Sequence, residues 1–172
     1  WNASRFALMN IEGYDPNAKL APYTLADKWI LSRLQHVSKE VTDLLGKFEL
    51  GEAGRTIYDF IWGEVCDWYI ELAKSRLNGD DAESAQNARQ VLLFVLDKIL
   101  KLLHPFMPFI TEEIYLALPN AEETIMLCQW PQWKEELVFE REEASLTRIL
   151  ELAKSIRALR AQMQAHPSNK TL

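Results

Sequence analysis

Long runs of apolar residues at three- and four-residue intervals constrain this chain more than any other feature. The runs cover residues 25–46, 52–77, 82–104 and 140–164. Spacing of this kind is typical of amphipathic α-helices, each of which must bury its apolar stripe against a neighbour. The chain is therefore predicted to be all-α.

Residues that stop helices separate these runs. Asn78 and Gly79 follow the second run, Pro105 follows the third, and Pro108 is placed to begin a further helix that Pro119 closes. Proline lacks an N–H and crowds the preceding turn, whereas Asn and Gly adopt the left-handed backbone that ends helices. Short connections between long helices indicate antiparallel neighbours, so we expect an antiparallel helical bundle.

Two segments depart from the helical pattern. Residues 124–130 are predicted to form one short extended segment before Pro131. The connection over residues 11–24 is the longest, and loops of that length in compact domains are often functional. We expect the bundle to span residues 1–164 and the polar residues 165–172 to form a flexible tail.

Composition excludes several classes of protein. Of the 172 residues, 48% are hydrophobic and 26% are charged, which is typical of a globular domain. No apolar run approaches the roughly 20 residues that span a bilayer, so no membrane partner is expected. The first residues lack a signal-peptide pattern and an initiator Met, which suggests a piece of a longer protein. Cys66 and Cys128 have no zinc-site spacing and favour reduced thiols in the cytoplasm.

The net charge of −6 argues against a general nucleic-acid binder, since such proteins are usually basic. The distribution of charge changes that conclusion. Acidic residues dominate residues 105–143, whereas residues 144–172 carry a net positive charge. The first helix, the loop after it and the last helix therefore remain available for contact with RNA.

Catalytic constellations are missing from the sequence. There is no Gly-rich phosphate loop, no nucleophile elbow and no paired-histidine metal helix. His104, Glu112 and Glu113 could bind a metal ion or exchange protons, which would make the chain a small enzyme. A helix-terminal histidine and two solvated glutamates explain these residues more simply. We therefore predict no catalytic residue and no metal site.

The beginning of the chain carries side chains suited to unpaired bases. They are Asn2, Arg5, Phe6 and Asn10 in an expected first helix, and Lys19 and Tyr23 in the loop that follows. Guanidinium and amide groups bond base edges, and aromatic rings stack on base faces. An ordinary solvated helix face is the alternative interpretation.

The segment around Trp68 combines core residues with charge. Asp67 and Glu71 are four residues apart, a like-charge spacing that mildly costs a helix unless Lys74 or Arg76 faces it. The alternative is ordinary bundle core with a polar outer stripe. The six tryptophans are expected to lie mostly in the core.

Several segments, taken in order, resemble one family over nearly the whole chain. They are Trp1–Phe6, Leu25–Leu34, Phe60–Trp62, Cys66–Glu71, His104–Tyr115, and Ile125–Met126 before Trp130–Pro131. Together they resemble the anticodon-binding domain of valyl-tRNA synthetases, which are class I aminoacyl-tRNA synthetases. The enzymes for isoleucine and leucine share weaker versions of the His104 segment. The Cys66 segment and Ile125–Met126 are what indicate valine.

The resemblance implies that catalysis and anticodon binding belong to different domains of a larger enzyme. Such an enzyme activates L-valine with ATP and Mg²⁺, transfers it to the 3′ end of its tRNA, and hydrolyses mischarged threonyl-tRNA. Its two ATP-site motifs, His-Ile-Gly-His and Lys-Met-Ser-Lys-Ser, are absent from this chain. The resemblance therefore implies a non-catalytic fragment without a cofactor of its own. Its partners would be the anticodon arm of a valine-accepting tRNA and the catalytic domain of the same parent chain.

The resemblance also bears on individual residues. Arg5 lies in the family's Asn-Ala-x-Arg-Phe pattern, which implies contact with the anticodon, and Asn2 and Phe6 share that pattern. Arg157 and Arg160 in the basic last run are expected to meet RNA phosphates. A helical protein–protein interaction module without RNA binding is the alternative, because acidity and amphipathic helices fit it as well.

Overall fold

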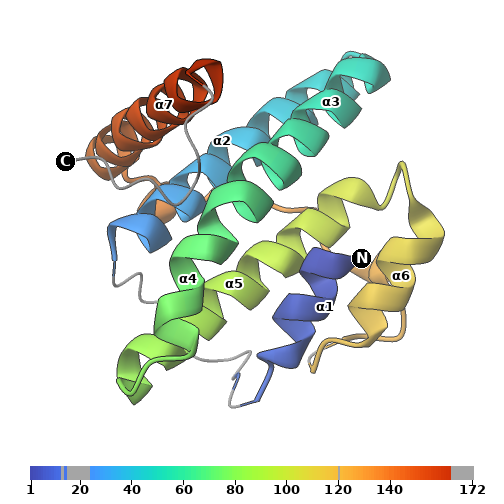
Figure 1. Ribbon diagram of the computed structural model, residues 1–172. Coiled ribbons are helices and arrows are strands. Elements are labelled where there is room, and N and C mark those ends of the chain that lie inside the picture. The colour runs from blue at the N-terminus through green and yellow to red at the C-terminus, as the bar shows by residue number, and fades with distance from the viewer. Residues whose placement is uncertain (13, 15–23, 120, 164–172) are drawn as a thin grey trace.

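The computed structural model describes residues 1–12, 14, 24–119 and 121–163, which form helices and turns and no strand. The elements follow in the order α1 (Asn2–Met9), α2 (Leu25–Gly46), α3 (Leu50–Phe60), the π-helical segment η1 (Ile61–Tyr69), α4 (Ile70–Leu77), α5 (Ala82–Leu103), α6 (Pro108–Leu116), the 3₁₀ turns η2 (Ile125–Leu127) and η3 (Glu135–Leu137), and α7 (Glu140–Gln162). Figure 1 shows these helices packed as a bundle, which confirms the all-α prediction.

Local chemistry sets the helix boundaries. At the start of α2, the Thr24 side chain accepts the Asp27 N–H (3.2 Å) and the Asp27 carboxylate accepts the Thr24 N–H (3.0 Å), which forms a capping box. Pro108 occupies the first turn of α6, as expected. At the end of α2, Phe48 rather than Gly46 takes the left-handed backbone, with φ of 61°.

The second predicted helix is continuous from α3 to α4, but its middle is π-helical. Nine residues of η1 join the two α-helices without a break. A π turn holds an extra residue, so the side chains beyond it lie in a different register from those of an unbroken α-helix. Tyr69 is fully buried, while Leu72, an apolar residue of the predicted run 52–77, is 38% exposed.

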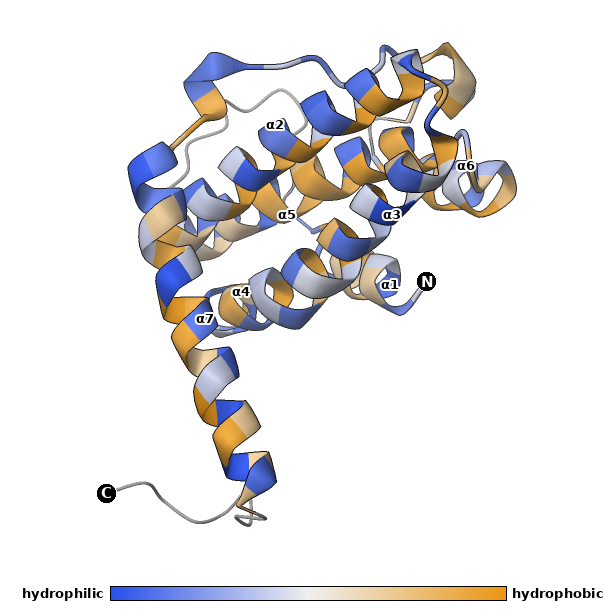
Figure 2. Ribbon diagram, turned by 90° about the horizontal axis from the view of Figure 1, so that it is seen from above, coloured by the Kyte–Doolittle hydropathy of each residue, from blue (hydrophilic) through white to orange (hydrophobic). Residues whose placement is uncertain are grey.

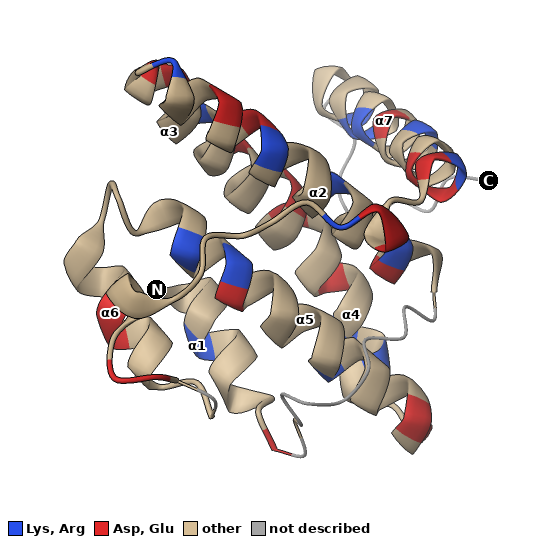
Figure 3. Ribbon diagram, turned by 180° about the vertical axis from the view of Figure 1, so that it is seen from behind, with Lys and Arg blue, Asp and Glu red and all other residues tan. Residues whose placement is uncertain are grey.

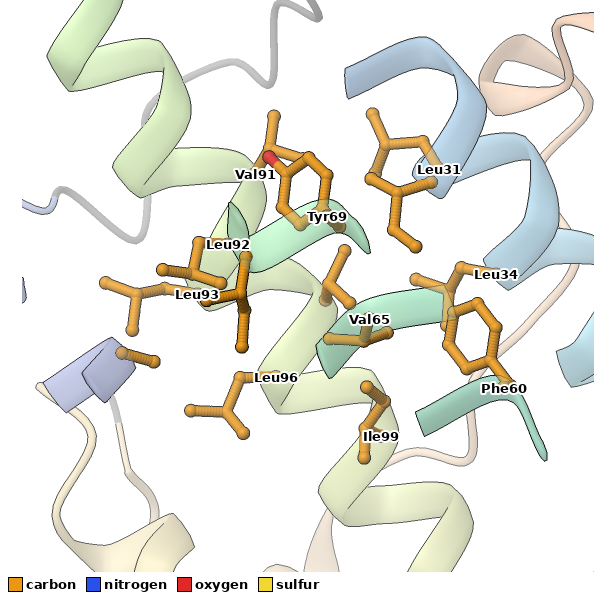
Figure 4. Packing of buried hydrophobic residues seen from close by; sticks show 14 of the residues in the cluster. Leu31, Leu34, Phe60, Val65, Tyr69, Val91, Leu92, Leu93, Leu96 and Ile99 are labelled. Atoms are coloured by element: carbon orange, nitrogen blue, oxygen red, sulfur yellow. The ribbon is translucent and has the colours of Figure 1, made fainter. Parts of the chain in front are cut away.

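The core is built around α5. This helix contacts α1, α2, α3, α4 and α6. Figure 4 shows Leu92, Leu93 and Leu96 of α5 packed among apolar side chains of α2, α3 and η1. Each such side chain contributes roughly 1.5–3 kcal/mol when it is fully buried.

The last helix is buried over only part of its length. Leu146 and Leu150 of α7 pack into the core, and α7 contacts α2. The remaining apolar residues, predicted to be buried, are between 44% and 62% exposed: Ile149, Leu152, Ile156 and Leu159. Figure 2 shows the reason, because α7 runs away from the body of the bundle and leaves these side chains without a helix to cover them.

The segment over residues 124–130 is not continuously extended. Thr124 and Cys128 have extended backbone, but Ile125–Leu127 between them form a 3₁₀ turn. The Glu112 carboxylate accepts the Ile125 N–H and the Thr124 hydroxyl, each at 3.1 Å, and these bonds favour the turn. The predicted extended segment is therefore confined to the flanks of a turn.

Two further expectations have different outcomes. Only Trp29 and Trp68 are buried among the tryptophans, whereas Trp1, Trp62 and Trp133 are exposed, so the expectation of mostly core tryptophans was wrong. Most of the 11–24 connection and the predicted flexible tail over 165–172 lie outside the described residues.

Candidate nucleic-acid interface

Helix α1 presents Asn2 and Arg5 to solvent and packs its opposite face against the bundle. Ser4 and Ala7 are buried, and α1 packs along α5. Asn2 and Arg5 are exposed on the opposite face, three residues apart and therefore neighbours on the helix surface. Within the described part of the chain, the Arg5 guanidinium forms no hydrogen bond or ion pair. Its donors are thus free to bind an external acceptor.

Phe6 and Asn10 lie beside this face but contribute to packing. The Phe6 ring is half buried, and the Lys74 ammonium lies 5.7 Å from its centre. The Asn10 amide donates to the Phe6 carbonyl at 2.9 Å and so satisfies the end of α1. The structure therefore brings all four predicted residues of α1 together, with Asn2 and Arg5 exposed and Asn10 already bonded.

Two basic side chains on α4, Lys74 and Arg76, each form an ion pair. The sequence allows either of them to offset the acidic pair Asp67 and Glu71. The Lys74 ammonium lies 2.5 Å from the Glu71 carboxylate, which offsets the like-charge spacing of Asp67 and Glu71. Arg76 does not share this role. It turns instead to a buried carboxylate on α2.

That carboxylate belongs to Asp27, and its hydrogen bonds link α2 to η1 and α4. The Arg76 guanidinium donates to both Asp27 oxygens at 2.8 Å, and the Tyr69 hydroxyl donates to one of them at 3.0 Å. Arg76 also donates to the Ser84 hydroxyl at 2.8 Å, which ties in α5. Burial and the Asp27 charge together raise the pKa of Tyr69 well above its usual value near 10.

This network positions the residue at which the loop rejoins the bundle. Thr24, the last residue of the loop, also accepts from Arg76 at 3.3 Å. The predicted residues Lys19 and Tyr23 precede it and lie outside the described residues. No local sequence pattern indicates that Arg76 and Tyr69 converge on Asp27, because the three residues belong to separate elements.

Arg157 and Arg160 are not brought to the same place as Arg5. The Arg157 guanidinium lies 4.5 Å from the centre of the Trp68 ring, and the Lys154 ammonium lies 6.0 Å from it. Figures 1 and 2 show α7 and α1 on opposite sides of the layer that contains α2 and α4. Those predicted RNA-binding residues that the structure describes therefore form two separate groups, one at α1 and one on α7.

The residues considered for metal binding are engaged elsewhere. The His104 Nδ1 lies 2.7 Å from the Thr111 hydroxyl, and that hydroxyl donates to the Met107 carbonyl at 2.8 Å. Glu112 holds the segment before η2, while Glu113 is exposed. Among the described residues, no three His, Cys, Asp or Glu side chains gather closely enough to hold a metal ion. No described helix is both long enough and apolar enough to traverse a bilayer.

Comparison with known proteins defines the class of this domain. The model of the family described as the anticodon-binding domain of tRNA ligase matches residues 27–172. The chain belongs to this family, which confirms the fold class expected from the sequence.

Individual relatives narrow the resemblance to one kind of tRNA ligase. The chain is 46% identical to a valine–tRNA ligase of Staphylococcus haemolyticus over its whole length, and 46% identical to one of Lactiplantibacillus plantarum over 98% of it. It is 47% identical to a valine–tRNA ligase of Geobacillus stearothermophilus, also over 98% of the chain. It spans about a fifth of the length of these relatives, covering 20%, 19% and 19% of them respectively.

Proposed function

We propose that this chain binds the anticodon arm of a valine-accepting tRNA as one domain of a valine–tRNA ligase. Membership of the anticodon-binding family and similarity to valine–tRNA ligases support this function. The structural observation that carries it is the outer face of α1, where Asn2 and Arg5 are exposed and Arg5 has no partner among the described residues.

The chemistry of this face suits a single-stranded RNA loop. A guanidinium fork donates to phosphate oxygens or to the acceptors of a base edge, and an amide both donates and accepts. Phe6 presents part of an aromatic ring beside the Lys74 ammonium, so a stacked base and a nearby phosphate would both find partners there. Asn10 supports this face by closing the end of α1.

In the parent enzyme, the reaction itself would take place in another domain. There, ATP with Mg²⁺ would activate L-valine before its transfer to the tRNA, while this domain holds the anticodon arm and so places the acceptor end. We place the enzyme in the cytoplasm, consistent with Cys66 and Cys128, which are both free thiols in the structure.

Fluorescence anisotropy with a labelled anticodon hairpin tests the proposal. We expect the 172-residue chain to bind a hairpin with a valine anticodon more tightly than one with a scrambled loop. Arg5→Ala should weaken binding by about fivefold or more, since a charge-assisted contact is lost. Arg55→Ala, which removes an exposed arginine of α3, is the matched control and should change binding by less than about twofold. Equal binding of both hairpins, together with no effect of Arg5→Ala, would overturn the proposal.

A helical protein–protein interaction module is the second candidate function. The exposed apolar residues of α7 favour it, because contiguous apolar surface marks interaction sites. This function predicts no RNA binding at all, and association with a protein partner that depends little on salt. The hairpin titration therefore separates the two functions.

A further inference from the structure

A polar groove of about 470 Å³ lies between α2, α5 and the segment that joins α6 to α7. None of the residues assigned above to RNA binding lines it. Its volume falls within the range of roughly 300–1,000 Å³ that is usual for small-ligand sites. Figure 3 shows the joining segment passing across α5 on the face where basic parts of α5 and α1 are both visible.

Three lysines supply positive charge to this groove. Asp97 lies beneath two of them, and its carboxylate is 2.9 Å from the ammonium groups of both Lys98 and Lys101. A buried carboxylate that binds two lysines fixes the position of their ammonium groups, whose remaining donors can bind an anion. The third lysine, Lys134, has an exposed side chain, and its backbone N–H donates to Gln35 at 2.9 Å. Among the described residues that line the groove, only Glu122 is acidic.

Aromatic and amide side chains lie beside these cations. The Trp130 indole N–H donates to the Thr42 hydroxyl at 2.8 Å, which fixes the orientation of the ring. The Phe94 ring lies 5.2 Å from the Lys98 ammonium. Gln129 is exposed and adds an amide that can bond the edge of a base. A protein binds a single-stranded nucleotide with cations that contact its phosphate, an aromatic ring that stacks on its base and polar groups that bond the base edge. The groove contains all three kinds of group.

We infer that this groove is a second RNA-binding site, which takes an unstacked nucleotide with its base against Trp130 and its phosphate near Lys98, Lys101 and Lys134. The inference rests on the proposed tRNA-binding function. It adds a contact separate from Arg5. Figure 3 shows α1 and the segment that lines the groove on the same face of the molecule, so a single tRNA could reach both. The groove would therefore increase affinity without reading the anticodon.

A pair of matched charge reversals tests this site with a full-length valine tRNA transcript. Lys134→Glu places a negative charge at the groove and leaves the backbone bond to Gln35 intact. Lys47→Glu makes the same change at an exposed lysine just after α2. We expect Lys134→Glu to weaken binding by about fivefold or more, and to reduce the slope of log affinity against log salt by about 0.7–0.9. Lys47→Glu should change affinity by less than about twofold.

Cross-linking locates the contact independently of affinity. Irradiation of the chain with tRNA that contains 4-thiouridine should give adducts on the peptide that includes Gln129 and Trp130. Equal effects of Lys134→Glu and Lys47→Glu with no such adduct would overturn this site. If Arg5→Ala still weakened binding in that case, the proposed function would stand. If the unmodified chain failed to bind tRNA, both proposals would be overturned.

Discussion

The Asp27 carboxylate is fully buried. Side chains from three other elements contact either Asp27 or Arg76, its ion-pair partner. Arg76 of α4 and Tyr69 of η1 donate to its oxygens, and Arg76 continues to Ser84 of α5. An isolated buried charge would cost several kcal/mol, and Arg76 supplies the opposite charge at 2.8 Å. One residue of α2 is thereby linked, directly or through Arg76, to η1, α4 and α5.

Removal of the arginine should expose this dependence. Arg76→Met leaves the Asp27 charge buried without its ion pair, so we expect the free energy of unfolding to fall by about 3–5 kcal/mol. Arg55→Met, at an exposed position of α3, should change it by less than about 0.5 kcal/mol. Urea unfolding followed by circular dichroism measures both variants. A loss below about 1 kcal/mol for Arg76→Met would show that Asp27 does not depend on this pair.

Tyr69 makes the stability of the domain depend on alkaline pH. Its pKa in the folded state is raised well above 10, whereas in the unfolded chain the phenol ionises near pH 10. The unfolded state therefore releases its proton first. The stability due to neutral Tyr69 is fully present below about pH 10 and is lost as pH rises above it.

Tyr69→Phe isolates this contribution. The variant should lose about 1 kcal/mol at pH 8, because the hydrogen bond to Asp27 is gone. Between about pH 9.5 and 11 its free energy of unfolding should decline less steeply than that of the unmodified chain. Urea unfolding at pH 8, 9.5 and 10.5 gives the comparison. Parallel declines would contradict the role assigned to Tyr69. Exposed Tyr58→Phe is the matched control and should leave the slope unchanged.

At the scale of elements, α7 consists of two unlike halves. Its first half is held by Leu146 and Leu150 in the core and by the Lys28–Glu142 ion pair at 2.9 Å. Its second half has Leu152, Ile156 and Leu159 exposed, so few buried contacts oppose its opening. Helical stability in proteins comes mostly from such packing rather than from intrinsic propensity.

Hydrogen exchange should divide α7 at its midpoint. We expect the amides of residues 152–162 to exchange at least about tenfold faster than those of residues 144–150 in the same helix. Helix α2, which is of similar length and lies against α3, α5 and α7, is the internal control and should be protected through its middle. Uniform protection along α7 would mean that its second half is packed as firmly as its first. Native-state exchange read by NMR or mass spectrometry makes the measurement.

The sequence predicted the elements of this domain better than the contacts between them. Apolar periodicity and the Asn78–Gly79 and Pro105 stops located the long helices because these signals are local. The same periodicity does not reveal what covers a stripe, so it predicted a buried face for the second half of α7. The convergence of Arg76 on Asp27 likewise joins residues that are distant in the chain. At the candidate interface, sequence chemistry selected Asn2 and Arg5 but did not suggest the groove around Lys134.

At the scale of the whole molecule, the basic groups lie on two sides of the bundle. Helix α1, which carries Arg5, and helix α7, which carries Arg157, lie on opposite sides of the layer of α2 and α4 (Figure 1), and basic parts of α1 and α5 are visible together in Figure 3. A short RNA hairpin that lies against α1 would have to pass around the edge of the bundle to reach α7.

This separation predicts that RNA length decides which arginines matter. Arg5→Ala should weaken the binding of an anticodon hairpin and of a full-length tRNA to the same extent. Arg157→Ala should change the affinity for the hairpin by less than about twofold. It should weaken the binding of full-length tRNA by about threefold, because only the longer molecule presents phosphates to both sides of the bundle. In full-length tRNA the two effects should add in free energy, since the sites share no partner. Anisotropy titrations of the two single variants and the double variant make the test. If Arg157→Ala weakened the hairpin as strongly as Arg5→Ala, both arginines would contact the same arm, and the RNA would have to wrap around the bundle.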